Sequence, residues 1–470
     1  MLTRNEKLWK PTETCSLFCL IPNQNPKTMN HSKSSDDLPY QEAHFDGIEK
    51  HILAAKGIPA NSKIGRRPFM DLLATVGGGL SLSALLSGCG SSEDSGAAAG
   101  SEEGGSELDE PVKIGYIPIT DSVPLILAHA KGYFEEEGLK TEKPTLIRGW
   151  SPLVEAFIAN KLNMAHFLIP IPLWMRYNND VKVKVMSWAH TNGSAIIVGG
   201  HTEAKDFKDL GGSQIAVPYW YSMHNIVLQM GLVEAGLKPV IKDQGAELAS
   251  DEVNLMVMPP PEMPASLAAK KIDAYIVAEP FNAMGELKAG GRVMRFTGDI
   301  WKNHPCCVVC LHEEQTVRKP IWTQKVMNAV VRANVYASKN KEEVAELLSK
   351  DGMGYLPMPA AVIKRAMTHY GTEEYMASGA CRNTADWKNG RIDFQPWPYP
   401  SATKFMVDWM NKTVVGGDNS FLDGLDREMV ASDLVDYDFV KKSCEMYPEW
   451  KDDPSVNPTD PYKREEVLSI

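Results

Sequence analysis

The feature that most constrains the fold is a regular alternation of short apolar strands and amphipathic helices that begins at Pro111. Gly138 and Gly236 stand where glycine commonly ends a helix. Short strand–helix–strand connections produce parallel strands that are covered by helices. We therefore predict an α/β fold with mainly parallel sheets. The predicted strands cover 112–117, 143–147, 164–168, 181–188, 195–198, 214–217, 253–257, 273–277, 292–296 and 307–311.

The pattern changes at Lys319, beyond which the chain is predicted to be mostly helical. Between the last two predicted helices, segment 386–400 carries aromatic residues among prolines. We expect this segment to be a surface loop anchored by its aromatic side chains; the alternative is that it leans over a ligand site. Residues 441–470 are charged and rich in proline, which predicts a loosely attached tail. The predicted helices cover 319–338, 341–350, 358–370 and 401–412.

The overall charge and composition exclude two classes of protein. A formal net charge of −11 argues against a nucleic-acid-binding protein, because such proteins need a basic surface to neutralise phosphates. The hydrophobic content of 43% is sufficient for a large core, and 470 residues suit two or three domains or one two-lobed unit. The longest apolar run, at 72–86, is shorter than the roughly 20 residues that span a bilayer. We therefore expect no membrane-spanning domain.

Two sorting signals follow one another in the N-terminal region. Arg66 and Arg67, followed by Phe69, resemble a twin-arginine export signal, and Leu86-Ser-Gly-Cys89 resembles a lipobox. Residues 65–89 are therefore predicted to be a lipoprotein signal with acylation at Cys89; the alternative is a short buried helix. Residues 1–64 are either a disordered leader or an over-extended translation start. The small and acidic residues of 90–110 predict a flexible linker.

The cysteine cluster near residue 306 suggests a different chemistry. Cys306, Cys307 and Cys310 lie between His304 and His312, a combination that could bind a metal ion. However, the apolar alternation predicts a strand, with Cys306 and Cys310 on one face and Cys307 on the other. Buried cysteine is also a common small hydrophobic residue. We favour structural cysteines over a metal or redox site, and leave the metal, if any, unassigned.

From about residue 111 to 413, a series of motifs resembles the periplasmic substrate-binding components of nitrate, bicarbonate, sulfonate and taurine ABC importers. The resemblance implies a periplasmic-binding-protein type II fold with two crossovers and a ligand between two lobes. Lobe one would comprise 111–217 and 306–440, and lobe two 218–305. The motifs are Gly115-Tyr-Ile-Pro-Ile-Thr-Asp-Ser-Val-Pro124, His129-Ala-Lys-Gly132, Met164-Ala-His-Phe-Leu-Ile-Pro-Ile-Pro172, Val257-Met-Pro-Pro-Pro-Glu-Met263, Ala278-Glu-Pro-Phe281 and Ile300-Trp-Lys-Asn-His-Pro305.

The resemblance also implies a function. It suggests a lipid-anchored protein outside the cytoplasmic membrane that captures nitrate, nitrite or bicarbonate and delivers it to the permease and ATPase subunits of an importer. Such a receptor needs no catalytic residues. Trp150 resembles the aromatic residue that contacts the ligand in the nitrate and bicarbonate branch, with ordinary packing as the alternative. A sulfonate or taurine receptor is the second reading, and a pyrimidine-precursor synthase that shares the fold is a less favoured third.

Polar residues at the ends of the predicted strands are the candidates for ligand contact. Ligands of open α/β folds bind at the carboxyl ends of strands, and helix N-termini favour anions. His166 lies in an apolar run and is expected to be a core residue. A carboxylate at residue 121 or 279 can face an anion only if the carboxylate is protonated or a cation lies between them. Calcium could be this cation if the ligand is bicarbonate. Apart from that case, we expect no required cofactor. The candidates are Thr120, Asp121, Trp150, Ser151, Pro170, Ser222, His224 and Glu279.

Overall fold

A computed structural model describes residues 106–383 and 390–470, which belong to one compact unit spanning 101–470. The predicted leader, the signal with Arg66, Arg67 and Cys89, and all but the end of the predicted linker lie outside the described residues. Among the described helices, none combines the length and the apolar character that crossing a membrane requires.

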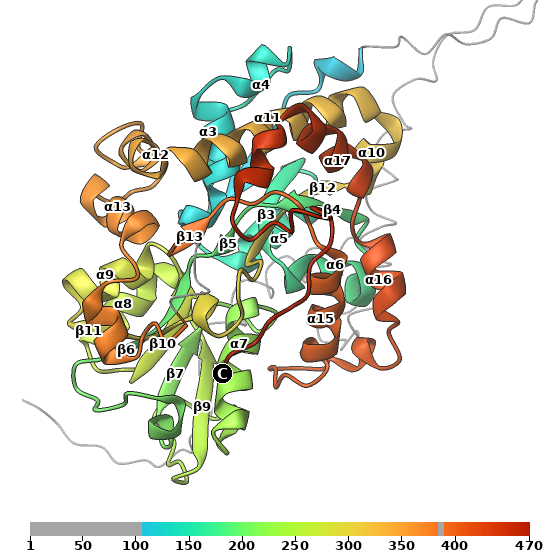
Figure 1. Cartoon of the computed structure of the whole chain (residues 1–470). Coiled ribbons are helices and arrows are strands. Elements are labelled where there is room, and N and C mark those ends of the chain that lie inside the picture. The colour runs from blue at the N-terminus through green and yellow to red at the C-terminus, as the bar shows by residue number, and fades with distance from the viewer. Residues whose placement is uncertain (1–105, 384–389) are drawn as a thin grey trace, which may run out of the picture. The chain divides into compact units, whose positions relative to one another are not determined.

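Two β-sheets organise the described chain (Figure 1). The first sheet has the order β2-β1-β3-β12-β4, and the second has the order β11-β6-β10-β7-β9-β8. The strands of the first sheet are β1 (Ile114–Tyr116), β2 (Thr145–Leu146), β3 (Met164–Leu168), β4 (Val183–Trp188) and β12 (Cys307–His312). Those of the second are β6 (Ser194–Gly199), β7 (Gln214–Val217), β8 (Lys238–Val240), β9 (Glu252–Val257), β10 (Ala274–Ala278) and β11 (Gly291–Phe296).

The α/β prediction is confirmed, but the sheets are more mixed than expected. β1 pairs in parallel with β2 and β3, whereas β12 is antiparallel to both β3 and β4. In the second sheet β6 is likewise antiparallel to β10 and β11. β6 and β12 are the strands by which the chain enters each sheet from the other one. A strand that enters a sheet from the other sheet starts in the region between the two sheets. The neighbouring strands run toward that region and end there, so the entering strand is antiparallel to them.

The chain leaves the first sheet earlier than predicted. β6 and β7 belong to the second sheet, so the boundary lies at residues 189–193 and not at 217. The apolar alternation of 195–198 identified a strand but not its sheet, because both sheets bury this pattern. The return crossing, between β11 and β12, lies close to the predicted boundary at 305.

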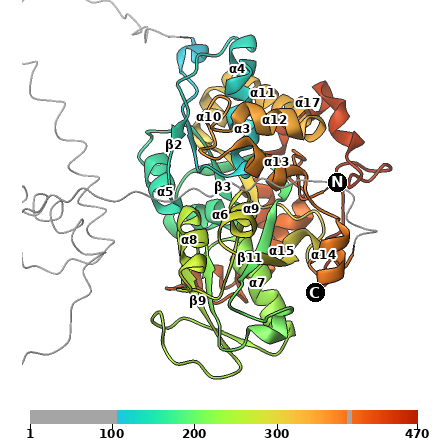
Figure 2. The same cartoon turned by 90° about the vertical axis from the view of Figure 1, so that its left-hand side faces the viewer.

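Helices cover both sheets, and the four long helices predicted after Lys319 are confirmed with ends that differ by no more than two residues. α11 packs on α3, α4 and α17, and α13 packs on α9 beside the second sheet (Figure 2). The helices are α3 (Val123–Ala130), α4 (Tyr133–Glu136), α5 (Trp150–Ile158), α6 (Pro170–Asn179), α7 (Met223–Glu234), α8 (Met263–Ala268), α9 (Phe281–Lys288), α10 (Glu313–Arg318), α11 (Pro320–Lys339), α12 (Lys341–Leu348), α13 (Ala360–Thr368), α14 (Glu373–Ser378), α15 (Pro400–Met410), α16 (Arg427–Asp433) and α17 (Tyr437–Met446).

Residues 390–396, which we call the strap, are buried and do not form the expected surface loop. Within the strap, β13 (Ile392–Asp393) pairs with β5 (Thr191–Asn192), the short strand between β4 and β6. The Pro396 carbonyl then accepts a hydrogen bond from the backbone N–H of Trp188 at the end of β4. The prediction was wrong because β-pairing with a distant segment leaves no signature in the local sequence.

The C-terminal residues are also fixed, contrary to the prediction of a loose tail. The Arg464 guanidinium lies 4.6 Å from the centre of the Trp188 ring and donates a hydrogen bond to the Asn303 carbonyl. Leu468 forms a β-bridge with Trp301, and Arg295 donates to the Ser469 carbonyl. Charged residues are here anchored by stacking and backbone hydrogen bonds, which composition alone does not reveal.

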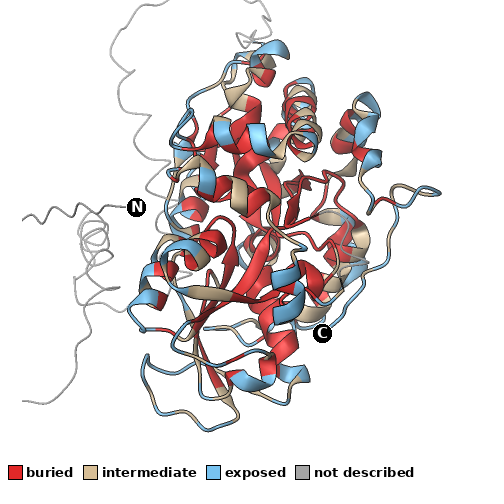
Figure 3. Cartoon of the chain, turned by 60° about the vertical axis from the view of Figure 1, so that its left-hand side comes forward, coloured by how far each residue is buried: buried red, intermediate tan, exposed pale blue. Residues whose placement is uncertain are grey.

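The strands of both sheets are mostly buried, and the exposed residues concentrate on the outer faces of helices and on loops (Figure 3). Several polar residues are nevertheless completely buried near the ends of the strands, where the two sheets are connected. Burial of a polar group is costly unless it has a partner. These residues therefore locate the candidate site.

Candidate functional site

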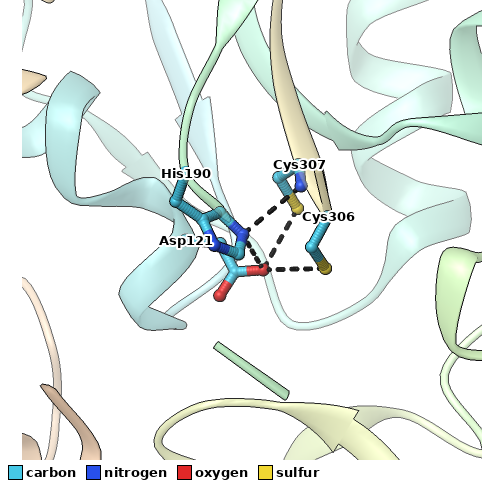
Figure 4. A group of neighbouring side chains, drawn as sticks. All are labelled: Asp121, His190, Cys306 and Cys307. Carbon is cyan, nitrogen blue, oxygen red and sulfur yellow. Dashed lines mark hydrogen bonds and ion pairs between the residues drawn. The ribbon is translucent and has the colours of Figure 1, made fainter. Parts of the chain in front are cut away.

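Four buried side chains from three segments meet at the edge of the first sheet, where the chain leaves after β4 and returns before β12 (Figure 4). Asp121 lies in the 3₁₀ turn Thr120–Ser122 after β1, and His190 follows β4. Cys306 immediately precedes β12, and Cys307 is its first residue. Asp121 Oδ1 is 2.7 Å from His190 Nε2, 3.4 Å from Cys306 Sγ and 3.3 Å from Cys307 Sγ. We call these four residues the Asp–His–Cys cluster.

Charge interactions inside this cluster shift the acidities of its members. Burial raises the pKa of Asp121 to about 6 even though His190 lowers it. Burial alone would lower the pKa of His190, but the Asp121 carboxylate raises it to about 10. Burial also opposes ionisation of both thiols. Cys307 and His224 nevertheless hold the pKa of Cys306 well below its usual value, while that of Cys307 lies well above.

The structure corrects the prediction that Cys306 and Cys307 face opposite sides of a strand. Because β12 begins at Cys307, Cys306 belongs to the crossing that precedes the strand, and the alternation of a strand does not apply to it. Both sulfur atoms reach the same carboxylate oxygen. Cys310 lies further along the strand, and the pKa of its thiol is raised by burial alone. The cysteines therefore divide into a cluster pair and a packing residue.

A histidine of the second lobe approaches the same cluster. His224, in the first turn of α7, contacts the Ser194 hydroxyl at 2.8 Å through Nε2 and lies 3.8 Å from Cys306 Sγ. Ser222, another predicted ligand contact, instead caps α7 by accepting a hydrogen bond from the Asn225 backbone N–H. Two of the predicted residues, Asp121 and His224, thus converge on Cys306 from opposite lobes.

Thr120 and Glu279 join the lobes by direct contact. The Thr120 backbone N–H and hydroxyl donate to the Glu279 carbonyl at 2.9 and 3.2 Å. The Glu279 carboxylate points elsewhere: Arg391 donates to one oxygen and the Ala283 N–H to the other. Burial raises the pKa of Glu279, and Arg391 opposes the effect. The positive charge that balances the Glu279 carboxylate is therefore supplied by Arg391 of the strap.

Trp150 and His166 form a second buried pair beside the cluster. Their rings meet edge to face with centres 5.6 Å apart. His166 Nε2 accepts a hydrogen bond from the Ile117 backbone N–H, so its proton is on Nδ1. Burial lowers the pKa of His166 to about 3, which keeps the ring neutral. Neither His166 Nδ1 nor Trp150 Nε1 has a hydrogen-bond partner, although both atoms are buried.

The remaining predicted residues lie outside these contacts. Ser151 is exposed in the first turn of α5, which begins at Trp150 after Gly149. Pro170 is the buried first residue of α6. The site residues that the sequence did not single out are His190, Ser194 and Arg391. His190 follows a predicted strand, so the strand-end rule could have found it, whereas Arg391 follows no recognised pattern.

The Asp121–His190 pair predicts that stability falls as the pH rises. Both folded-state pKa values lie above their unfolded values, so the folded chain binds more protons between about pH 4 and pH 10. The contribution of His190 is complete below pH 6.5 and is lost as the pH approaches 10. We expect a loss on the order of 4 kcal/mol over that range in chelator-containing buffer, measured by urea unfolding. His190→Gln should abolish this part of the loss; an unchanged profile would contradict the assignment.

A model of the NMT1-like family matches residues 105–349 of the chain. Among curated proteins, the nitrate/nitrite binding protein NrtA of Nostoc sp. is 26% identical over 372 residues, which is 72% of this chain and 81% of the relative. The bicarbonate-binding protein CmpA of Synechococcus sp. is 22% identical over 383 residues, or 73% of this chain and 81% of the relative.

Solved structures show the same fold. The periplasmic nitrate-binding protein NrtA from Synechocystis PCC 6803 superposes with a TM-score of 0.62 at 17% identity, covering 77% of this chain and 94% of that one. The alkanesulfonate-binding protein SsuA from Xanthomonas axonopodis pv. citri gives a TM-score of 0.51 at 16% identity, covering 69% and 97%. The predicted periplasmic-binding-protein fold is confirmed, and the Asp–His–Cys cluster lies at the crossings between its two lobes.

Proposed function

The chain belongs to the NMT1-like family, and from this premise we propose that it is an extracytoplasmic solute-binding protein that captures a small anion for an ABC importer. Its relatives are transport components, and the chain is a binding protein and not an enzyme. The observation that supports an anion as the ligand is the group of buried N–H donors without partners near the Asp–His–Cys cluster. Delivery to permease and ATPase subunits, acylation at Cys89 and twin-arginine export belong to the same proposal.

Unpaired buried donors are rare in folded proteins and call for an explanation. Trp150 Nε1 and His166 Nδ1 each carry a hydrogen that no protein atom accepts. His190 adds a third, because its raised pKa keeps a hydrogen on Nδ1, which also lacks a partner. The charge on His190 contributes to the low pKa of His166, so the two rings interact electrostatically. An oxyanion would satisfy several such donors at once.

The two nearby carboxylates do not oppose this reading. Asp121 is neutralised by His190, and the Glu279 carboxylate is fully engaged by Arg391 and a backbone N–H. We therefore propose that neither carboxylate contacts the anion directly. Calcium also suits this site poorly, since calcium prefers six to eight oxygen ligands, whereas the cluster offers sulfur and nitrogen.

The packing of the second lobe favours a compact anion over an organic sulfonate. Met223 is completely buried, and the Tyr221 ring stacks on Trp174 with centres 5.5 Å apart. These apolar side chains pack against protein neighbours, so the unpartnered N–H donors remain as the groups that could contact a ligand. Nitrate, nitrite and bicarbonate share the required planar oxygen acceptors, and the relatives named above bind nitrate, nitrite or bicarbonate.

Calorimetric titration of the purified chain tests this function. We expect binding of nitrate, nitrite or bicarbonate, the last with and without calcium, and weaker or no binding of taurine. Trp150→Phe keeps the ring but removes one donor, and should weaken anion binding about tenfold, since a hydrogen bond to a charged group contributes roughly 1.5–3 kcal/mol. Trp174→Phe is the matched control and should bind normally. Tight taurine binding without anion binding would favour the sulfonate receptor, and equal affinities of the two variants would refute the role of Trp150.

A further inference from the structure

We propose that Asp121, His190, Cys306 and Cys307 form a site for one divalent metal ion of the zinc class. This site goes beyond the proposed function, because anion capture by the N–H donors does not require it. Each of the four residues offers one ligand atom, and the four atoms lie within 4.8 Å of one another. All four side chains are completely buried, so the group is not a chance gathering on a surface.

The spacing of the donors suits tetrahedral coordination. Zinc bonds of about 2.0–2.3 Å give a tetrahedron whose edges are about 3.3–3.8 Å. Asp121 Oδ1 lies 3.4 and 3.3 Å from the two sulfur atoms, which matches such edges. The 2.7 Å contact between Asp121 Oδ1 and His190 Nε2 is shorter, as expected where a shared proton takes the place of an ion. Loading would lengthen this contact and leave the two oxygen–sulfur distances nearly unchanged.

The chemistry of the donors selects the class of metal. Two thiolates, one imidazole and one carboxylate suit zinc and other thiophilic ions, and they do not suit calcium or magnesium. Thiolates are the form in which cysteine binds a metal ion. Binding displaces the protons held by the thiols and by His190 Nε2 to solvent. Four protein ligands complete the coordination, as in structural rather than catalytic zinc sites.

Two buried atoms of the cluster, other than the proposed ligand atoms, have no hydrogen-bond partner. Asp121 Oδ2 and His190 Nδ1 are both buried without a hydrogen-bond partner. A metal ion on Oδ1 would stabilise the carboxylate that otherwise depends on His190 and the thiols. When Nε2 binds the ion, Nδ1 of His190 keeps its hydrogen and can still donate a hydrogen bond.

The position of the cluster gives the ion a structural role and an electrostatic effect. His190 precedes β5, and Cys306 follows Pro305, which forms a β-bridge with Thr191, so the ion would tie both crossings to the turn that carries Asp121. A divalent ion with two thiolates and a carboxylate leaves a net negative charge. Metal loading should therefore weaken anion binding at the neighbouring donors, and the anion should weaken metal binding by the same factor.

Titration of the purified, chelator-treated full chain with Co²⁺ tests the site, because cobalt replaces zinc and reports thiolate ligands by charge-transfer absorption. We expect the absorption to saturate at one equivalent and to disappear when zinc is added. Cys306→Ser and Cys307→Ser should each abolish or strongly weaken it. Cys310→Ser is the matched control on the same strand and should leave it intact. Asp121→Asn, which retains an oxygen at the cluster, should shift the spectrum and weaken binding at least tenfold.

Mass measurement of the intact wild-type chain under non-denaturing conditions guards against variants that do not fold, since one added zinc should be seen without any substitution. Absence of both the cobalt band and the zinc adduct in the wild-type chain would overturn the proposal. So would a band lost in Cys310→Ser but kept in Cys306→Ser. Anion calorimetry on the chelated chain is a separate readout: anion binding without a cobalt band rejects only the metal site, and a cobalt band without anion binding rejects only the proposed function.

Discussion

Arg391→Met is expected to lower the free energy of unfolding by about 3–5 kcal/mol, the cost of leaving a buried charge without its partner. The guanidinium is completely buried and pairs with Glu279 and, at 3.0 Å, with Glu286. It also donates to the His369 carbonyl and the Tyr375 hydroxyl. Methionine has a similar length but satisfies none of these acceptors, so two carboxylates would remain buried beside an apolar side chain.

Urea unfolding of the wild type and two variants measures the effect. Arg365→Met is the control, because Arg365 pairs with the same Glu286 at 2.9 Å but its side chain is 24% exposed. The Arg365→Met substitution should lower the free energy of unfolding by no more than about 1 kcal/mol, as for partly exposed ion pairs. Lowering the pH to 5 should reduce the deficit of Arg391→Met, since an unpaired buried carboxyl group takes up a proton and becomes neutral. Equal losses in both variants, or a deficit independent of pH, would contradict the assigned role.

Removal of residues 462–470 is the second change with a large expected effect, at least about 3 kcal/mol of unfolding free energy. Tyr462 packs against Trp397 with ring centres 4.6 Å apart, and Arg464 covers the ring of Trp188. Without this segment, Trp301 loses both the β-bridge to Leu468 and the hydrogen bond from its indole N–H to Glu466. Apolar surface of three tryptophans would then be exposed to water.

Urea unfolding followed by tryptophan fluorescence checks this result, because the affected rings are themselves the probes. Lys463→Met is the matched control, since the Lys463 side chain is 82% exposed and pairs with Asp460 nearby in the chain. Arg464→Met should account for part of the loss through the stacked ring and the Asn303 carbonyl. A truncated chain as stable as Lys463→Met would show that the segment rests on the surface without stabilising it.

Local patterns were sufficient for much of the fold. Most strands and the four long helices after Lys319 could be located from apolar periodicity, whereas the short strands β5, β8 and β13 could not. The strand-end rule identified Asp121 and His224 as site residues. The boundary between lobes could not be found this way, because β6 has the same apolar pattern whichever sheet it joins. Which strands pair depends on contacts between distant segments, and the periodicity of the local sequence does not indicate them.

Long-range partners explain the other failures. Arg391 lies 112 residues beyond Glu279, and nothing in the residues around either one indicates the pair. The strand was correctly predicted to begin at Cys307, but its alternation was also applied to Cys306, which precedes it, and this hid the shared contact with Asp121. The charges of the C-terminal residues suggested solvation, but Arg464 places its charge over an aromatic ring. Composition describes the preference of a side chain and not the partner available to it.

The strap and the C-terminal segment have a consequence for how a solute would leave. Besides the two crossings, the strap connects Glu279 of the second lobe with Trp188 of the first, and the C-terminal segment connects Trp188 with Arg295. Separating the lobes therefore requires breaking interactions in several segments at once, which slows both the entry and the release of an enclosed solute. We expect a long residence time for the captured solute, so that transfer depends on a transport partner supplying the free energy of opening.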